Sequence, residues 1–179
     1  MTRLKVPVSS RDHIHGSNNA PITLIEYGDY QCPHCGAAQP VVKQIQARFG
    51  ERLRLVYRHF PLVEIHPLAG PAAEVAEFAG AHGQFWEMHD AIFANQHRLS
   101  VPLLISLATN LGLSHVALRD ALAAGTYAEK IQSDFIGGVR SGVNGTPTFF
   151  VNDIRYESPL GVAGLAATLD QILLAGAKS

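Results

Sequence analysis

The chain has 179 residues, of which 47% are hydrophobic and 16% are charged, and its formal net charge is −1 at pH 7. These values suit one globular domain, or one domain with a large insertion, that buries a substantial hydrophobic core. The balanced charge, without a basic stripe, argues against nucleic acid as a partner. No apolar run reaches the ~18 residues of a membrane-spanning helix, so no stable membrane insertion is expected.

The N-terminal stretch MTRLKVPVSSRDH lacks the apolar centre of a secretory signal peptide. We therefore expect a cytoplasmic protein, with the periplasm or cell envelope as the alternative if a leader has been trimmed. The chain holds 2 cysteines, too few for the multiple disulfides that stabilise small secreted domains. A disulfide between them would close one small loop and would add little stability.

In chain order, the first patterned segment is PITLIEYGDY at 21–30, which is apolar and β-rich and predicts a buried strand. A helix is expected from Cys32 onward, because apolar residues recur at helical spacings as far as Phe49, and Gly50 marks its end. LRLVYRHFPL at 53–62 predicts a second strand. Strand, helix and strand in this order indicate two parallel strands joined by a right-handed crossover.

The central part of the chain carries helical patterns almost throughout. Glycines separate the expected helices, Pro102 and Ser114 lie where helices should start, and the helices cover 67–82, 84–96, 101–111, 114–124 and 126–143. Helical spacing favours the protein core for four large side chains, with a substrate groove as the alternative: Phe85, Trp86, Met88 and Phe93.

The last part of the chain returns to strand patterns. TPTFFVN at 146–152 and IRYES at 154–158 predict a β-hairpin with its turn at Asn152 and Asp153, and 161–175 predicts a closing amphipathic helix. The elements together predict an α/β architecture. We expect one domain built from 1–63 and 144–179, with a second, all-helical domain inserted at 64–143.

Both cysteines lie in Cys32-Pro33-His34-Cys35, where strand gives way to helix. Residues three apart share a helix face, so the two sulfurs can approach bonding distance. The free N–H groups and the positive dipole end of the helix should lower the pKa of Cys32. A cationic His34 should stabilise the Cys32 thiolate further. Pro33 suits the first turn of the helix. The pattern predicts that Cys32 reacts and that the more shielded Cys35 resolves the mixed disulfide.

Two other interpretations of the cysteine pair are a structural disulfide and half of a zinc site. Zinc would need two further ligands, and the chain has no second C-x-x-C pair. His13 and His15 resemble a ligand pair, but two ligands make a weak site. We therefore expect no metal and no cofactor.

The segments APITLIEYGDYQCPHC, FWEMHDAIF and NGTPTFFVN together resemble the DsbA-like branch of the thioredoxin superfamily, over about residues 12–175. The resemblance implies a thioredoxin-like fold, a central sheet flanked by helices, with an inserted all-helical domain. It also implies thiol–disulfide oxidoreductase activity on protein thiols or disulfides. Pro147 matches the family's cis-proline, and Thr146 before it is expected to tune the thiolate and substrate release, so both are candidate substrate-binding residues.

Glu26 lies six residues before Cys32, where the family has a buried acid beneath the active site. It shares a strand face with Ile22 and Leu24, and both faces of that strand are mostly apolar, so we expect it to be buried. A buried carboxyl has a raised pKa and can pass a proton to or from Cys35.

The direction of electron flow stays open: the pair would act as an oxidase, or as a reductase or isomerase, depending on its redox poise. An unidentified redox partner must recycle the disulfide. Some relatives with this fold are glutathione-dependent transferases or isomerases, but those usually have serine in place of the attacking cysteine. A further alternative is a redox-sensing interaction module, because similar domains occur attached to membrane transporters.

Overall fold

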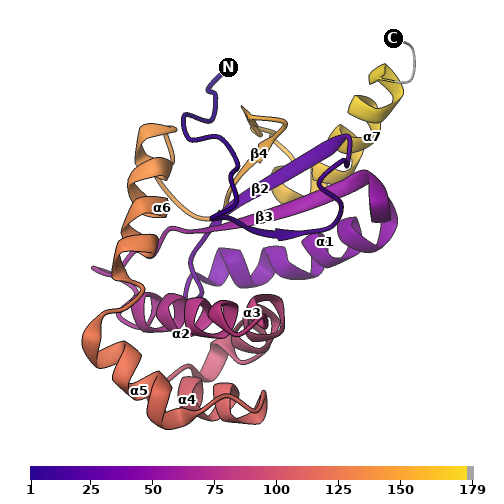
Figure 1. The fold of residues 1–179 in the computed structure, drawn as a ribbon. Coiled ribbons are helices and arrows are strands. Elements are labelled where there is room, and N and C mark those ends of the chain that lie inside the picture. Colours follow the sequence, from indigo (N-terminus) through magenta and orange to yellow (C-terminus); the bar gives the residue numbers. More distant parts are fainter. Residues whose placement is uncertain (177–179) are drawn as a thin grey trace.

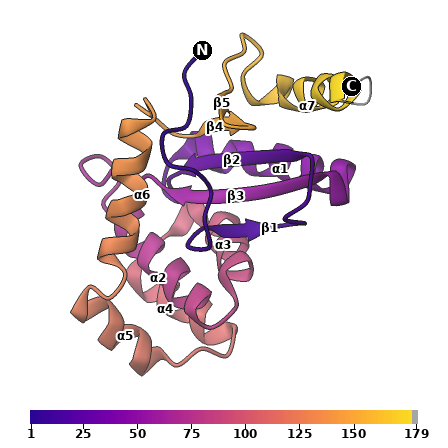
Figure 2. The same ribbon diagram turned by 45° about the horizontal axis from the view of Figure 1, so that its top comes forward.

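The computed structural model describes residues 1–176, which form one five-stranded sheet with helices on both sides (Figures 1 and 2). The strands are β1 (His13–His15), β2 (Ile22–Gly28), β3 (Leu53–His59), β4 (Thr148–Val151) and β5 (Ile154–Arg155). The helices are α1 (Pro33–Phe49), α2 (Ala69–Ala81), α3 (Phe85–Ala94), α4 (Val101–Asn110), α5 (His115–Ala124), α6 (Ala128–Arg140) and α7 (Leu165–Gly176), with short 3₁₀ turns η1 (Gly50–Arg52), η2 (Gln96–Arg98) and η3 (Gly161–Gly164).

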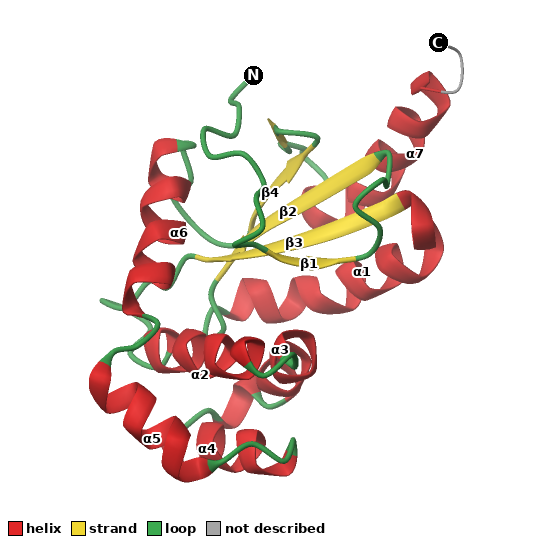
Figure 3. Ribbon diagram, viewed as in Figure 1, coloured by secondary structure: helices red, strands yellow, loops and turns green. Residues whose placement is uncertain are grey.

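The sheet has the order β1-β3-β2-β4-β5, and its β2–β3 pair is parallel whereas the other pairs are antiparallel. The parallel pair confirms the predicted strand–helix–strand unit. One face of the sheet packs against α1 and α7, and the other is covered by the N-terminal segment and α6 (Figure 3). Every residue of β2 is buried, as expected for a central strand with helices or chain on both faces.

The two predicted parallel strands end earlier than expected, for reasons visible in the chain. β2 stops at Gly28 because Asp29 begins a turn. β3 stops at His59: the N–H of Phe60 still bonds the carbonyl of Gly28 at 2.8 Å, but Pro61 has no N–H with which to extend the ladder.

The helical region α2–α6 was predicted from periodicity, and its helices are present with slightly shorter bounds. The side chain of Ser114 caps α5 by accepting from the N–H of Ala117 at 3.2 Å, and Gly125 ends that helix in a left-handed conformation, with φ 61°. Phe85 and Met88 lie in the core of this region, whereas Trp86 and Phe93 are only partly buried against it. Within residues 1–176, every helix is too short or too polar to serve as a bilayer span.

The C-terminal hairpin turns at Asn152 and Asp153 as predicted, with φ values of 46° and 68°. The predicted strand 154–158 was too long: β5 ends at Arg155, although the N–H of Tyr156 still bonds the carbonyl of Phe149 at 2.8 Å. The closing helix starts with the 3₁₀ turn η3 before α7. Residues 177–179 of the predicted segment 144–179 lie outside the described residues, and the domain boundaries themselves stay predictions.

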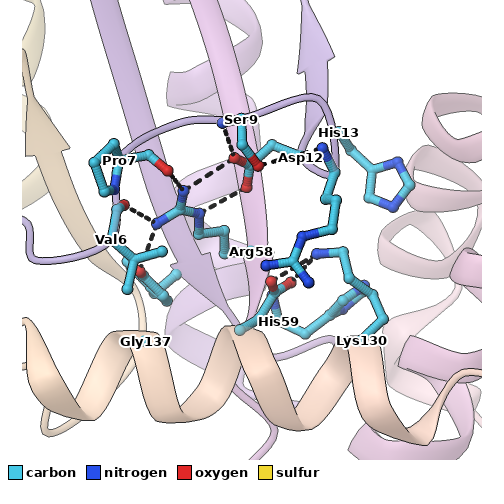
Figure 4. A network of polar contacts seen from close by, with 12 residues as sticks. Val6, Pro7, Ser9, Asp12, His13, Arg58, His59, Lys130 and Gly137 are labelled. Atoms are coloured by element: carbon cyan, nitrogen blue, oxygen red, sulfur yellow. Dashed lines mark hydrogen bonds and ion pairs between the residues drawn. The ribbon is translucent and has the colours of Figure 1, made fainter.

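A buried arginine fixes the N-terminal segment against the sheet (Figure 4). Arg58 on β3 donates to both carboxylate oxygens of Asp12 at 2.7 and 3.0 Å, to the carbonyls of Val6 and Pro7, and to the hydroxyl of Tyr27. Burial alone would raise the pKa of Asp12, but the Arg58 guanidinium lowers it overall. Charge pairing with this number of hydrogen bonds is what makes a buried guanidinium tolerable.

Candidate active site

The two cysteines sit at the N-terminus of α1, directly after the turn that follows β2. Cys32 is the N-cap residue and Pro33 occupies the first helical position, as the spacing predicted. Cys32 is 4% exposed and Cys35 is 0% exposed, and both are free thiols. Cys32 is thus slightly more accessible than Cys35, which is fully shielded.

The pKa of Cys32 is lowered to about 5. The largest cause is a hydrogen bond from the side chain of Cys35, which outweighs burial; the side chain of Thr146 and the backbone N–H groups of Cys35 and His34 lower it further. The His34 side chain itself is exposed. Its backbone N–H is thus the part of His34 that acts on the thiolate here, and the predicted role of its imidazole stays a prediction.

The inner cysteine has the opposite character. Hydrogen bonding to Cys32, followed by burial and the nearby charge of Glu26, raises the pKa of Cys35. The backbone N–H of Asp29 points at its sulfur from 3.5 Å. The pair therefore holds one proton between two sulfurs, with the negative charge on Cys32.

Glu26 is buried on β2, as its place in the strand predicted, and it is 0% exposed. Burial raises the pKa of this carboxyl from 4.5 to about 8, against a lowering by the Gln39 amide, whose Nε2 lies 3.4 Å from Oε1. The other oxygen, Oε2, has no hydrogen-bond partner among the described residues. A carboxyl that titrates near neutral pH beside Cys35 can accept or supply a proton there, so the proton-relay role stays a well-placed prediction.

The loop before β4 faces the reactive sulfur. The Thr146–Pro147 peptide bond is cis, and the carbonyl of Thr146 lies 3.4 Å from the sulfur of Cys32. The Thr146 hydroxyl is buried and makes no hydrogen bond by distance and angle within residues 1–176. The structure thus brings Thr146 and Pro147 to Cys32 across more than a hundred residues of sequence, while their roles in substrate binding stay predictions.

Asp29 is a site residue that sequence reasoning missed. Its buried carboxylate accepts hydrogen bonds from the backbone N–H groups of Gln31 (2.7 Å), Cys32 (3.1 Å) and Leu62 (2.9 Å), and pairs with Nδ1 of His66 at 2.8 Å. It therefore joins the active-site turn to the loop after β3. The available signal was an aspartate three residues before a helix N-cap, a spacing typical of a side chain that closes a turn.

The helical region is also tied directly to the active-site turn. Nε2 of Gln96 donates to the carbonyls of Tyr30 and Cys32 at 2.9 and 2.8 Å, and Oε1 of Gln31 accepts from the N–H of Leu68 at 2.7 Å. A β-carbon added at Gly36 would overlap Oε1 of Gln96, so a larger residue would displace the Gln96 side chain from this contact. Nothing in the local sequence could have revealed partners so far apart along the chain.

His13 and His15 do not act as a pair. His15 lies edge-on to Trp86, while His13 joins a cluster with His59 and Glu77 that could offer three ligand atoms to a metal. Nε2 of each of the two imidazoles lies 2.7 Å from the same oxygen, Oε1 of Glu77. Ligands held at 2.0–2.1 Å around tetrahedral zinc stand roughly 3.3 Å apart, so the spacing suits shared hydrogen bonds better than a metal.

Comparison with known proteins identifies a family model and curated relatives that match most of the chain. A family model described as thioredoxin matches residues 9–171. Among curated proteins, the Na⁺/H⁺ antiporter NhaA 1 of Salinispora arenicola is 44% identical over 167 residues, which cover 93% of this chain and 26% of the antiporter. NhaA of Herminiimonas arsenicoxydans is 36% identical over 168 residues, 93% of this chain and 27% of that protein. The chain therefore spans about a quarter of the length of these curated relatives.

Solved structures show the same fold at low identity. BdbD from Bacillus subtilis, in its oxidised form, has a TM-score of 0.85 with 22% identity, covering 96% of this chain and 98% of that one. α-DsbA1 from Wolbachia pipientis has a TM-score of 0.80 with 20% identity, covering 94% of each chain. These likenesses show a thioredoxin-like sheet with an inserted helical region, as in DsbA.

Proposed function

The chain belongs to the thioredoxin family and has a DsbA-type fold, and from this premise we propose that it is a thiol–disulfide oxidoreductase acting on protein thiols. The observation that carries the proposal is the opposite tuning of the two sulfurs, with the pKa of Cys32 lowered to about 5 and that of Cys35 raised. A structural disulfide has no need of such a difference, whereas exchange chemistry requires one reactive and one resolving sulfur.

The oxidised protein would work by two exchange steps. A substrate thiolate attacks the sulfur of Cys32, the Cys32–Cys35 bond breaks, and Cys35 leaves as a thiolate that takes the proton of Glu26. A second substrate thiolate then attacks the substrate sulfur of the mixed disulfide, and Cys32 leaves with the electron pair. The product is an oxidised substrate and a reduced protein, which an external oxidant must reset.

The acidity of Cys32 favours this oxidising direction. A thiolate stabilised in the folded protein stabilises the reduced state, which makes the disulfide a stronger oxidant. Because the folded pKa is lowered, this stabilisation is complete above the ordinary pKa of a cysteine and is lost as pH falls through about 5. A disulfide donor of this kind would suit the cell envelope, whereas a reducing cytoplasm would favour the reverse reaction.

A groove beside the cis-proline is the site we propose for substrate residues next to the reacting cysteine. It has a volume of about 320 Å³ and is lined by Pro147, Phe149, Tyr156 and Val162, among others. Its lining combines these apolar side chains with polar and charged ones, among them Arg155, Glu157 and Ser158. This mixture suits an extended polypeptide better than a small charged molecule.

Multiple-turnover oxidation of a reduced protein substrate, with glutathione disulfide as the resetting oxidant, tests the proposal. The wild-type protein is expected to oxidise many equivalents of substrate, because Cys32 is both an attacking and a leaving thiolate. Substrate consumption is measured against protein concentration. Oxidation that stops after one equivalent, with fresh oxidant present, contradicts a catalytic role.

Such a stoichiometric result would favour a second candidate, a redox-sensing module of a membrane transporter. The 44% identity to a segment of an NhaA antiporter is the observation in its favour. A sensor would change its stability or partner binding when the Cys32–Cys35 bond opens, without turnover. The two candidates thus differ in turnover number, although they use the same two sulfurs.

A further inference from the structure

A line of polar side chains leads from the helical region into the sheet and ends at the buried carboxyl of Glu26. The hydroxyl of Tyr30 lies 3.0 Å from Nδ1 of His89, Nε2 of His89 lies 3.3 Å from Oε1 of Gln39, and Nε2 of Gln39 lies 3.4 Å from Oε1 of Glu26. All four residues are buried. They come from the active-site turn, α3, α1 and β2, so the line crosses from the helical region to the central strand.

The chemistry of these groups gives the line a direction. The amide nitrogen of Gln39 can only donate, so Glu26 accepts at the end of the line. The amide oxygen of Gln39 can only accept, so Nε2 of His89 carries a hydrogen and Nδ1, as the acceptor, receives the hydroxyl of Tyr30. Burial lowers the pKa of His89, which agrees with a neutral imidazole having one donor and one acceptor nitrogen.

We propose that Gln39 and His89 are positioning residues for proton transfer at Cys35, because their directed hydrogen bonds favour the ionised, proton-accepting form of the buried Glu26 carboxyl. This inference rests on the proposed exchange function. When Cys35 resolves a mixed disulfide, its S–H proton passes to the Glu26 carboxylate and its sulfur bonds that of Cys32. The partner leaves as a thiolate. A donor aimed at the carboxylate favours the ionised form, which burial opposes.

The hydrogen bonds on both sides of Gln39 are long enough to shorten when Glu26 becomes ionised. The 3.3 and 3.4 Å separations exceed the usual 2.7–3.2 Å of such bonds, and bonds to an ionised acceptor are shorter. Other titratable groups act on or near Glu26: Cys35 from α1, Tyr57 from β3, and Tyr30 from the turn. None of these three groups donates a hydrogen bond to the carboxyl, and among the described residues Gln39 is its one donor.

Gln39 also connects this interior to solvent. Gln39 is 8% exposed. It lines a groove of about 350 Å³ between α1 and α3, together with Gly36, Pro40, Lys43, Asp90 and Phe93. Pro40 has no N–H to donate to the carbonyl of Gly36, which leaves that carbonyl able to accept from water. Glu26 is therefore separated from a solvent-facing groove by the Gln39 side chain that donates to it.

The test follows reduced protein as it reacts with a chromogenic aromatic disulfide. Attack by Cys32 releases a first coloured thiol, and resolution by Cys35 releases a second, so the two phases separate the two sulfurs. In Gln39→Met, the first phase should keep its pH profile. The midpoint of the second phase should move upward by about one pH unit, which makes that phase about tenfold slower on the acid side, because loss of a donor to the carboxylate raises its pKa.

Two variants make the result specific. His89→Phe keeps an aromatic ring at a site packed by rings, and it should shift the second phase in the same direction by less; it also carries the test alone if Gln39→Met does not fold. Gln46→Met removes an amide seven residues along the same helix and should leave both phases unchanged. Folded Gln39 and His89 variants with wild-type second phases would overturn the inference, whereas a wild-type protein without any second release would instead refute the proposed function.

Discussion

Replacing Cys32 by serine is expected to abolish thiol–disulfide exchange, leaving less than about a thousandth of the wild-type turnover. The hydroxyl of serine cannot form or break a sulfur–sulfur bond, and Cys35 is fully buried with its pKa raised, so it cannot take over as the nucleophile. The measurement is turnover of a reduced protein substrate, with the circular dichroism spectrum of the variant as a check of its fold.

Cys35→Ser is the matched variant, because it removes the other sulfur from the same helix. It should still react once through Cys32 and then accumulate as a mixed disulfide, which mass spectrometry detects as an added substrate mass. Substantial turnover in Cys32→Ser, or equal behaviour of the two variants, would contradict the assignment of an attacking and a resolving sulfur.

Glu26→Gln is expected to have the second largest effect: it should slow the resolving step by Cys35 but make the folded protein more stable at alkaline pH. Without a carboxylate to take the proton of Cys35, the resolving step should slow by about a hundredfold near pH 8 and lose its dependence on a group titrating there. The release of the second coloured thiol from an aromatic disulfide measures this step directly.

The same variant should be more stable than the wild type at alkaline pH. The pKa of Glu26 is raised in the folded protein from 4.5 to about 8. Stability from this group is therefore complete below the unfolded pKa and falls by about 1.4 kcal/mol per pH unit as pH rises towards the folded pKa. Denaturant unfolding of the oxidised proteins isolates this effect, because neither cysteine titrates in a disulfide. Parallel stability curves for the two proteins between pH 5 and 8 would show that Glu26 is not a buried, titrating carboxyl.

Much of this site could be predicted from the local sequence, because its central elements follow one another along the chain. The buried strand, the turn and the helix start follow one another from Ile22 to Pro33, so periodicity and helix-capping preferences place Cys32 correctly. Strand parity likewise placed Glu26 on a buried face. The resemblance to a known family added the cis-proline, which no local pattern could have brought next to Cys32.

What the sequence could not show depends on contacts between distant segments. Gln39 looks like any polar residue of an amphipathic helix, and His89 like any histidine, until α3 packs against α1. The same holds for Gln96, whose partners lie 64 and 66 residues away. The sequence pointed to the helix end as a source of the acidity of Cys32, and the backbone N–H groups of His34 and Cys35 do lower its pKa. The largest cause, the hydrogen bond from the Cys35 side chain, was not anticipated, and the role of the His34 ring stays a prediction.

The proposed exchange chemistry requires Cys32 to be a thiolate at neutral pH, and a pH titration of the reduced protein tests this most directly. Thiolate absorbance in the ultraviolet, cross-checked by the rate of alkylation at Cys32, should rise with a midpoint near pH 5. A midpoint near the ordinary value of about 8.5 would contradict the account, because the two sulfurs would then not be tuned apart.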